Sequence, residues 1–360
     1  MAPPTAETYQ VLLTGNPGTE DVMALEAEEE LYATRILDVR RGHGRVVASI
    51  PQWSLERVYS MRSIHSAILL HRVARGISPG PEGLDEIGRA ALESGLHRFI
   101  PDGATFAVRA IRAGNHSFHS PDIARVVGDS IARSALAEGR SVRVRLSSPS
   151  IVIEAHLIED TLYLGVSLSG SRSLHRRGVR VYDHPAALKP TLAYVMLRLA
   201  QARDGEVIAD PMCGGGTVAI EAALTFVQSS IICMDKNAAH IEGAKMNAAA
   251  ARVSRRVKFL VGDARSIHEL LGRSSIDVVV SNPPYGIRLG SPSAVRGLYR
   301  DFVPSLAEAL SPGGRAALIT TEGALIQRLA GNAGLRVEHT RRVRHGDLWA
   351  TIVVVRKPGG

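Results

Sequence analysis

An asparagine, two prolines and a tyrosine follow directly on a run of valines in the stretch VVVSNPPYG, residues 278–286. Proline supplies no backbone N–H and holds φ at about −65°, so the chain leaves an expected strand stiffly and its carbonyl groups remain unpaired. A strand that merely ends at Pro283 and Pro284 would explain the prolines, but not the amide of Asn282 and the ring of Tyr285. The tetrapeptide therefore predicts a functional site at a strand end.

A glycine-rich turn earlier in the chain forms a second candidate site, in IADPMCGGGTVAIEA, residues 208–222. Gly214, Gly216 and Ala219 have the G-x-G-x-x-A spacing between an expected strand and an expected helix, and Asp235 ends the next expected strand, about twenty residues on. Glycines let the backbone approach a ligand, and an aspartate at this place accepts hydrogen bonds from ribose hydroxyls. The order of strand, turn, helix and acid predicts a nucleotide cofactor site; the alternative is a structural tight turn.

Two further aspartates bear on which cofactor fits. Asp210 stands just ahead of the glycines, where a carboxylate would repel a pyrophosphate and attract a cation. This favours S-adenosylmethionine, which carries an α-ammonium and a sulfonium, over NAD. Asp263 ends the third expected strand, where it could accept a hydrogen bond from an adenine amino group or cap the helix that begins there. The two interpretations of Asp263 are compatible.

A sheet must bring these strand ends together. Between residues 191 and 320, short apolar strands alternate with helices, and this pattern predicts a parallel sheet covered on both faces. Ligands bind beyond the carboxyl ends of such strands. Residues 335–357 predict two further strands joined by a short polar turn and antiparallel to each other. The expected C-terminal fold is α/β and Rossmann-like, mostly parallel with an antiparallel last strand.

The first 170 residues lack this alternation and predict two α+β units. The expected boundary with the C-terminal domain lies between residues 170 and 185. The first unit is expected to contain a strand at 9–14, a helix at 18–33, a hairpin at 35–50 and a helical stretch at 54–61. The second is expected to contain helices at 83–95 and 120–138 and strands at 105–113, 150–160 and 161–170.

Composition narrows the class of protein. The formal charge of +8 and the pI of about 9.8 fit a polyanionic partner as well as they fit an ordinary basic enzyme. Two cysteines outside any CxxC pair argue against a disulfide framework or a cysteine zinc site. The chain has neither a basic leader followed by an apolar run nor an apolar stretch of about 18 residues. We expect a cytoplasmic, soluble protein without a membrane partner.

The thirteen histidines have no HExxH or comparable ligand spacing. His116 and His119 in NHSFH could be considered as metal ligands, but a loop that leads into a helix is the favoured interpretation because no acidic partner stands near them. We expect no metal ion.

The motifs DPMCGGGT at 210–217 and NPPYG at 282–286 resemble the amino-methylating S-adenosylmethionine-dependent methyltransferases, in which (N/D)PP(Y/F/W) binds an exocyclic amino group. The resemblance implies that the side-chain oxygen of Asn282 and the carbonyl of Pro283 accept the two amine hydrogens, and that Tyr285 stacks on the target base. It also implies S-adenosylmethionine as cofactor and the following binding residues: Pro190, Thr191, Asp210, Met212, Cys213, Gly214, Gly216, Thr217, Asp235, Lys236, Asp263, Ala264 and Asn282.

Other segments extend the resemblance over almost the whole chain. Residues 116–132 are similar to the core of a THUMP domain, and residues 173–193 resemble the linker and first motif of the THUMP-containing RNA guanine-N2 methyltransferases. The tRNA enzymes that act at guanosine 6 of the acceptor stem are the most similar group. Gly215 stands where many relatives have serine or threonine. The implied domains are a ferredoxin-like domain at 1–70, a THUMP RNA-binding domain at 71–170, a linker at 171–185 and the methyltransferase domain at 186–360.

The implied partner is tRNA, bound through the THUMP domain at the acceptor stem and 3′ end, by a monomeric enzyme. A guanine paired in a stem hides its amine, so the nucleotide would have to flip out of the stack. Clustered arginines are often a solvated face, but here they would contact the RNA backbone. The candidates are Arg172, Arg176, Arg177, Arg180, Arg288, Arg341, Arg342 and Arg344.

Three alternatives compete with this interpretation. Related guanosine-10 enzymes more often carry DPPY, so Asn282 favours guanosine 6 or a ribosomal RNA substrate over guanosine 10. A DNA or protein amine methyltransferase could use the same tetrapeptide, but the non-catalytic N-terminal half favours RNA. An NAD-dependent oxidoreductase would need no such tetrapeptide and no terminal antiparallel hairpin.

Overall fold

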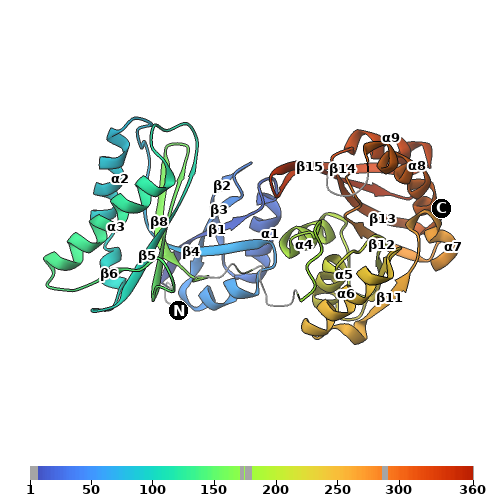
Figure 1. Cartoon of the computed structure of the whole chain (residues 1–360), viewed down its shortest axis with the longest axis horizontal. Coiled ribbons are helices and arrows are strands. Elements are labelled where there is room, and N and C mark those ends of the chain that lie inside the picture. Colours follow the sequence, from blue (N-terminus) through green and yellow to red (C-terminus); the bar gives the residue numbers. More distant parts are fainter. Residues whose placement is uncertain (1–6, 171–173, 175–180, 286–290, 360) are drawn as a thin grey trace, which may run out of the picture. The chain divides into compact units, whose positions relative to one another are not determined.

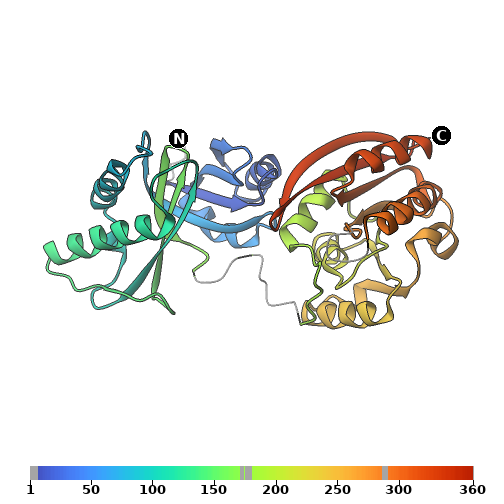
Figure 2. The ribbon, with the colours of Figure 1, turned by 45° about the horizontal axis from the view of Figure 1, so that its top comes forward.

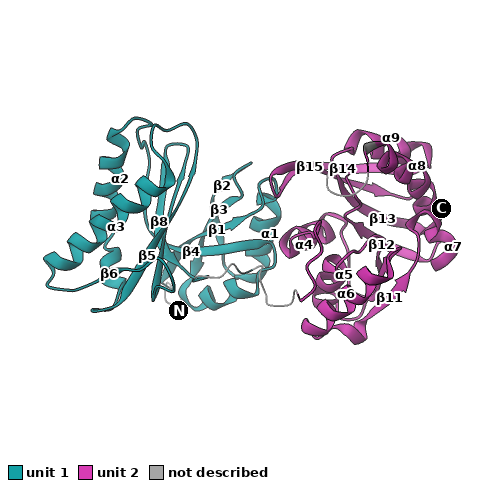
Figure 3. Cartoon of the chain, in the orientation of Figure 1, with its two compact units in different colours: residues 1–174 teal, residues 175–360 magenta. Residues whose placement is uncertain are grey.

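The computed structural model describes residues 7–170, 174, 181–285 and 291–359. The chain divides into two compact units, residues 1–174 and residues 175–360 (Figure 3). Each unit has its own sheet and its own hydrophobic core. Among the described residues, no helix is long and apolar enough to cross a membrane.

The described part of the first unit contains one eight-stranded sheet with the order β2-β3-β1-β4-β8-β7-β5-β6. Helices α2 and α3 pack side by side over its second half (Figures 1 and 2). The stretch expected to be helical at 54–61 is a 3-10 helix. The elements are β1 (Thr8–Gly15), α1 (Glu20–Glu30), β2 (Arg35–Arg40), β3 (Arg45–Pro51), η1 (Gln52–Ser60), β4 (Ile64–Ala74), α2 (Glu82–Glu93), η2 (Leu96–Phe99), β5 (Thr105–Ala113), α3 (Ser120–Ala137), β6 (Arg143–Val144), β7 (Ile151–Ile158) and β8 (Thr161–Ser167).

Strand β4 joins the two α+β units that the sequence predicts. It pairs antiparallel with β1 on one side and with β8 on the other. At Gly165 of β8 the two strands approach so closely that a Cβ atom would lie 2.1 Å from the Leu69 carbonyl oxygen. Strand β4 is not predicted from the sequence, because its polar and apolar residues do not alternate strictly. The expected division at residue 70 falls inside this strand.

Buried polar contacts also connect the two halves of this sheet. Three strands separate β3 from β7, yet Arg45 Nε of β3 donates to His156 Nδ1 of β7 at 3.1 Å. Likewise, Arg40 Nε of β2 donates to the Tyr163 hydroxyl of β8 at 3.0 Å. The sheet therefore curls strongly enough for distant strands to face each other, as twisted sheets do.

The second unit confirms the expected α/β class. Its sheet has the order β11-β10-β9-β12-β13-β15-β14; β9 to β13 are parallel, and β15 runs antiparallel to both β13 and β14. Helix α9 is not predicted from the sequence. The elements are α4 (Pro190–Leu199), β9 (Val207–Asp210), α5 (Thr217–Thr225), β10 (Ser230–Asp235), α6 (Ala238–Ala250), η3 (Ser254–Arg256), β11 (Val257–Val261), η4 (Ala264–Ser266), α7 (Ile267–Leu271), β12 (Ile276–Ser281), α8 (Pro292–Ala309), β13 (Leu310–Thr320), α9 (Gly323–Asn332), β14 (Arg336–His345) and β15 (Leu348–Arg356).

Helices cover both faces of this sheet. Helices α4, α5 and α6 pack along one face, and α7, α8 and α9 along the other (Figures 1 and 2). The strands read as continuous apolar runs because both of their faces are buried. Phe302 and Leu306 of α8 belong to the same hydrophobic core as Val279 of β12 and Val353 of β15.

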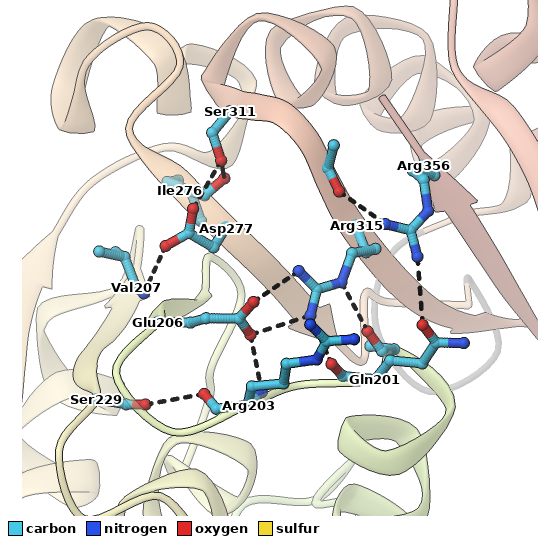
Figure 4. A network of polar contacts seen from close by, with 12 residues as sticks. Gln201, Arg203, Glu206, Val207, Ser229, Ile276, Asp277, Ser311, Arg315 and Arg356 are labelled. Carbon is cyan, nitrogen blue, oxygen red and sulfur yellow. Dashed lines mark hydrogen bonds and ion pairs between the residues drawn. The ribbon is translucent and has the colours of Figure 1, made fainter. Parts of the chain in front are cut away.

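A buried arginine ties the amino ends of the parallel strands together (Figure 4). Arg315 of β13 donates from Nη1 to Glu206 Oε1 at 2.8 Å and from Nη2 to Glu206 Oε2 at 3.0 Å, just ahead of β9. Asp277 of β12 accepts from Val207 N at 2.9 Å and from Ser311 Oγ at 2.8 Å. These contacts hold β9, β12 and β13 in register, so that the opposite, carboxyl ends of the three strands are also fixed.

Candidate active site

A cavity of about 580 Å³ lies at the carboxyl edge of the parallel strands in the second unit. Twelve of the predicted catalytic and cofactor-binding residues line it: Asp210, Met212, Cys213, Gly214, Thr217, Asp235, Lys236, Asp263, Ala264, Asn282, Pro283 and Tyr285. Gly216, Pro190 and Thr191 do not line it; Thr191 is fully buried in α4. The strand ends thus meet as the fold requires.

The two glycines of the turn have different reasons to be glycine. Gly214 has a φ of +51° and Gly216 a φ of +79°, both in the left-handed region that favours glycine. A Cβ at Gly214 would lie 3.3 Å from the His184 ring, and one at Gly216 would lie 3.0 Å from the Ala244 side chain of α6. Gly214 N donates to Asp235 Oδ2 at 2.9 Å. Gly214 therefore faces the cavity, while Gly216 allows close helix packing behind it.

Asp210 is a buried acid at the end of β9. Its Oδ1 accepts from Ser281 Oγ at 2.7 Å and from Met212 N at 3.3 Å. Burial raises the pKa of Asp210 to about 7, although both hydrogen bonds oppose the rise. A cation bound in the cavity would stabilise the ionised form of this carboxyl group.

The other two aspartates that follow strands, Asp235 and Asp263, accept hydrogen bonds from neighbouring residues. Asp235 Oδ1 accepts from Asn237 N at 2.9 Å and from His240 Nδ1 at 3.2 Å. Asp263 Oδ1 accepts from Arg265 N at 3.0 Å, which is the cap that the sequence suggested. Its Oδ2 also accepts from Arg265 Nη2 at 2.7 Å. The Arg265 guanidinium holds the pKa of Asp263 below its usual value.

The asparagine of the tetrapeptide has a fixed orientation. Asn282 Nδ2 donates to the Ala186 carbonyl at 3.0 Å, and the Tyr285 hydroxyl donates to Asn282 Oδ1 at 2.6 Å. The expectation of unpaired carbonyls fails for Pro284, whose carbonyl accepts from the Tyr299 hydroxyl at 2.8 Å. Among the described residues, no donor contacts the Pro283 carbonyl. An amide oxygen and a backbone oxygen thus stand at the cavity wall.

Asn247, which is not among the residues predicted from the sequence, holds the chain segment ahead of α4 against the glycine turn. Its Oδ1 accepts from Val181 N and Tyr182 N, both at 2.8 Å. Its Nδ2 donates to the Tyr182 carbonyl at 3.0 Å and to the Gly215 carbonyl at 2.9 Å. Asn247 is 4% exposed. An asparagine inside the alanine-rich helix α6 was a usable signal, because asparagine is a poor residue for a helix interior.

The two cysteines lie side by side behind the turn. Cys233 Sγ is 2.6 Å from Cys213 Sγ, and both residues are buried free thiols. Burial raises the pKa of the Cys213 thiol, so the thiolate is disfavoured. Among the described residues, no group of three His, Cys, Asp or Glu side chains could hold a metal ion.

The arginines singled out from the sequence divide into two groups. Arg341, Arg342 and Arg344 lie on β14, which forms one edge of the sheet. Arg342 and Arg344 are exposed, and the Arg342 guanidinium stands 5.2 Å from the centre of the Trp349 ring. The remaining candidates lie outside the described residues: Arg172, Arg176, Arg177, Arg180 and Arg288.

Two domain families match the chain in the order that the fold suggests. Residues 82–167 match the THUMP domain, and residues 177–351 match the RMKL-like methyltransferase domain. The fold and the cavity, together with these matches, define a THUMP-containing protein with a Rossmann-like methyltransferase domain.

Relatives of nearly full length narrow this class. The tRNA (guanine(6)-N2)-methyltransferase of Archaeoglobus fulgidus is 33% identical, over 95% of this chain and 90% of that protein. The enzyme of the same name from Methanocaldococcus jannaschii is 31% identical, over 94% and 98%. The crystal structure of TrmN from Thermus thermophilus matches with a TM-score of 0.80 and 31% identity, covering 97% of this chain and 99% of that one. The chain belongs to the tRNA (guanine(6)-N2)-methyltransferase family, as the resemblance of its motifs implied.

Proposed function

We propose that this chain transfers a methyl group from S-adenosylmethionine to the exocyclic 2-amino group of guanosine 6 in the acceptor stem of tRNA. The observation that carries the proposal is the position of Asn282 at the wall of the cavity, with its amide oriented by the Ala186 carbonyl. Family membership supports the choice of substrate, because the relatives described above are named for guanine 6 of tRNA.

The chemistry of the cavity residues fits the proposed cofactor. When bound, S-adenosylmethionine supplies a methyl group attached to a positively charged sulfur. Asp210 offers a buried carboxyl group that becomes ionised more readily beside a cation. Asp235 offers carboxylate oxygens to ribose hydroxyls, and the bare Cα of Gly214 lets a ligand approach the turn closely. We assign cofactor binding to these three residues and to the other members of the predicted set that line the cavity.

The tetrapeptide would act on the amine through its acceptors. A guanine amino group is a poor nucleophile because its lone pair is delocalised into the ring. Hydrogen bonds to Asn282 Oδ1 and the Pro283 carbonyl would draw the two amine hydrogens to one side and aim the nitrogen lone pair at the methyl group. This is catalysis by positioning and by preorganised acceptors.

Flipping the nucleotide would cost a few kcal/mol. Stacking on Tyr285 would offset about 1–3 kcal/mol of this cost. The Tyr285 hydroxyl donates a hydrogen bond to Asn282 Oδ1 in the structure. The incoming amine would therefore share this acceptor with Tyr285 or replace the Tyr285 hydroxyl as its donor.

We assign RNA backbone contacts to Arg342 and Arg344, which are exposed on the edge strand β14. We also propose that the THUMP domain, assigned to residues 71–170, binds the acceptor stem and 3′ end. The ferredoxin-like domain would then comprise residues 1–70, so that strand β4 is shared between the two domains, and the linker would comprise residues 171–185. Finally, we propose that the enzyme works as a cytoplasmic monomer.

Mass spectrometry tests the proposal. A tRNA transcript with guanosine at position 6 is incubated with the protein and S-adenosylmethionine, digested with a sequence-specific ribonuclease and analysed by fragment mass. We expect one or more methyl groups on the fragment that contains nucleotide 6, and N2-methylated guanosine after complete digestion to nucleosides. Methylation confined to another nucleotide, or to ribosomal RNA in a parallel reaction, would overturn the assignment.

A further inference from the structure

His345 reaches the tetrapeptide from a segment sixty residues further along the chain. It is the last residue of β14, and its side chain lines the cavity. The His345 Nδ1 atom lies 3.2 Å from the Tyr285 hydroxyl oxygen. The two rings meet edge to face, with centroids 6.0 Å apart and an interplanar angle of 84°. Such an arrangement is favourable for aromatic pairs in addition to the hydrogen bond.

The direction of each hydrogen bond follows from the chemistry of the partners. The Ala186 carbonyl can only accept, so the Asn282 amide must place Nδ2 toward it and Oδ1 toward Tyr285. Tyr285 has one hydroxyl proton, and Asn282 Oδ1 can only accept it. The contact between His345 Nδ1 and the Tyr285 oxygen is therefore a hydrogen bond that His345 donates.

Protonation of the imidazole does not remove this donor. The neutral ring with its hydrogen on Nδ1 and the doubly protonated ring both carry an Nδ1–H group. Burial raises the pKa of Tyr285, which keeps the phenol protonated and able to donate to Asn282. In both protonation states of the ring, His345 can therefore donate to the Tyr285 hydroxyl, and Tyr285 can donate to Asn282.

We propose that His345 is a positioning residue for methyl transfer: through the Tyr285 hydroxyl it holds the stacking ring and the Asn282 acceptor in place before the guanosine enters. The inference rests on the proposed function and extends it to a residue of the C-terminal hairpin. Strand β14 is parallel to β12, so both strands end at the same edge of the sheet. The antiparallel strand β15, inserted between β13 and β14, produces this arrangement.

A kinetic comparison of five variants with the wild type tests the proposal. The variants are His345→Ala, His345→Asn, His345→Gln, Tyr285→Phe and the double variant His345→Ala/Tyr285→Phe. An asparagine amide can place an N–H group close to the position of Nδ1, so His345→Asn is the rescue variant. His345→Gln is the matched control, because its longer side chain carries the N–H group closer to the position of Nε2.

We expect His345→Ala to lower kcat for methylation of tRNA by roughly two- to tenfold, the effect of one hydrogen bond. The KM for tRNA should change by less than about twofold, because phosphate contacts dominate affinity for nucleic acids. Affinity for S-adenosylmethionine should not change. His345→Asn should restore most of the activity and His345→Gln should not.

The double variant decides whether His345 acts through the hydroxyl. In the Tyr285→Phe background, His345→Ala should cause no further loss, because the atom to which His345 donates is already gone. An equal loss in both backgrounds would overturn the proposal, and so would a failure of His345→Asn to recover activity. If the proposed function itself were wrong, the wild type would place no methyl group on guanosine 6, which is a different result.

Discussion

Replacement of Asp210 with asparagine should make the free energy of unfolding of the second unit less dependent on pH. Asparagine keeps the Oδ1 atom that accepts from Ser281 and Met212, but it cannot ionise. The pKa of Asp210 rises from an ordinary 3.8 to about 7 on burial. The folded protein therefore holds a proton that the unfolded chain releases, so the stability contributed by this proton is lost as the pH rises toward 7.

The size of the effect follows from the same values. A difference in pKa from 3.8 to about 7 corresponds to about 4 kcal/mol, at about 1.4 kcal/mol for each pH unit. Roughly 3 kcal/mol of this stability is lost between pH 5 and pH 8.5. The rest is lost below pH 5, where the aspartate of the unfolded chain ionises. The free energy of unfolding of Asp210→Asn, relative to the wild type, should rise by roughly 3 kcal/mol between pH 5 and pH 8.5.

Tryptophan fluorescence during urea denaturation measures this in the second unit alone. The chain has two tryptophans, Trp53 in the first unit and Trp349 in the second. Trp53 is 61% exposed, so Trp53→Phe should fold normally and leave Trp349 as the reporter. Asp263→Asn is the matched control, because the pKa of Asp263 is lowered and its carboxylate is ionised at both pH values. The prediction would be refuted if the free energies of unfolding of Asp210→Asn and the wild type differed by the same amount at pH 5 and at pH 8.5.

Three further predictions concern the site and the fold. Asn282→Ala should nearly abolish single-turnover methylation of tRNA while filter binding and calorimetry show largely unchanged affinity for tRNA and S-adenosylmethionine; wild-type turnover would contradict its role. Asn247→Ala should weaken S-adenosylmethionine binding by roughly tenfold, because it removes a hydrogen bond to the Gly215 carbonyl and leaves buried groups unpaired. Calorimetry measures this affinity, and an unchanged affinity would show that the turn needs no such support. Gly165→Ala should destabilise the first unit by roughly 1–3 kcal/mol, because its Cβ would meet the Leu69 carbonyl; Trp53 fluorescence in a Trp349→Phe background measures this, and an unchanged urea midpoint would refute it.

Much of the second unit is predictable because its pattern is repeated. Short apolar strands that alternate with helices require a parallel sheet, and such a sheet brings the residues that follow its strands to one edge. Asp210, Asp235, Asp263 and Asn282 line one cavity for this reason. The motifs also indicated their chemistry, because in each of them a polar or aromatic residue follows a strand and is not required to form that strand.

Other features of the site depend on contacts between distant segments, which local patterns do not record. His345 is the last residue of β14, next to a polar turn that any exposed hairpin could have. Ala186 acts through its carbonyl, a group that every residue carries. Strand β4 has a mixed pattern because residues on both of its faces belong to hydrophobic clusters and because its register is interrupted between Leu70 and Arg72, which also conceals the continuity of the first unit. These features became visible only in three dimensions.

The central claim is that the protein methylates the 2-amino group of guanosine 6 in tRNA. Its most direct test compares two synthetic tRNAs that differ only at position 6, one with guanosine and one with inosine, which lacks the 2-amino group but still pairs with cytidine. Transfer of a labelled methyl group from S-adenosylmethionine is measured for both. We predict incorporation into the guanosine tRNA and none into the inosine tRNA. Equal incorporation into both would contradict the account, because the methyl group would then reside on another atom.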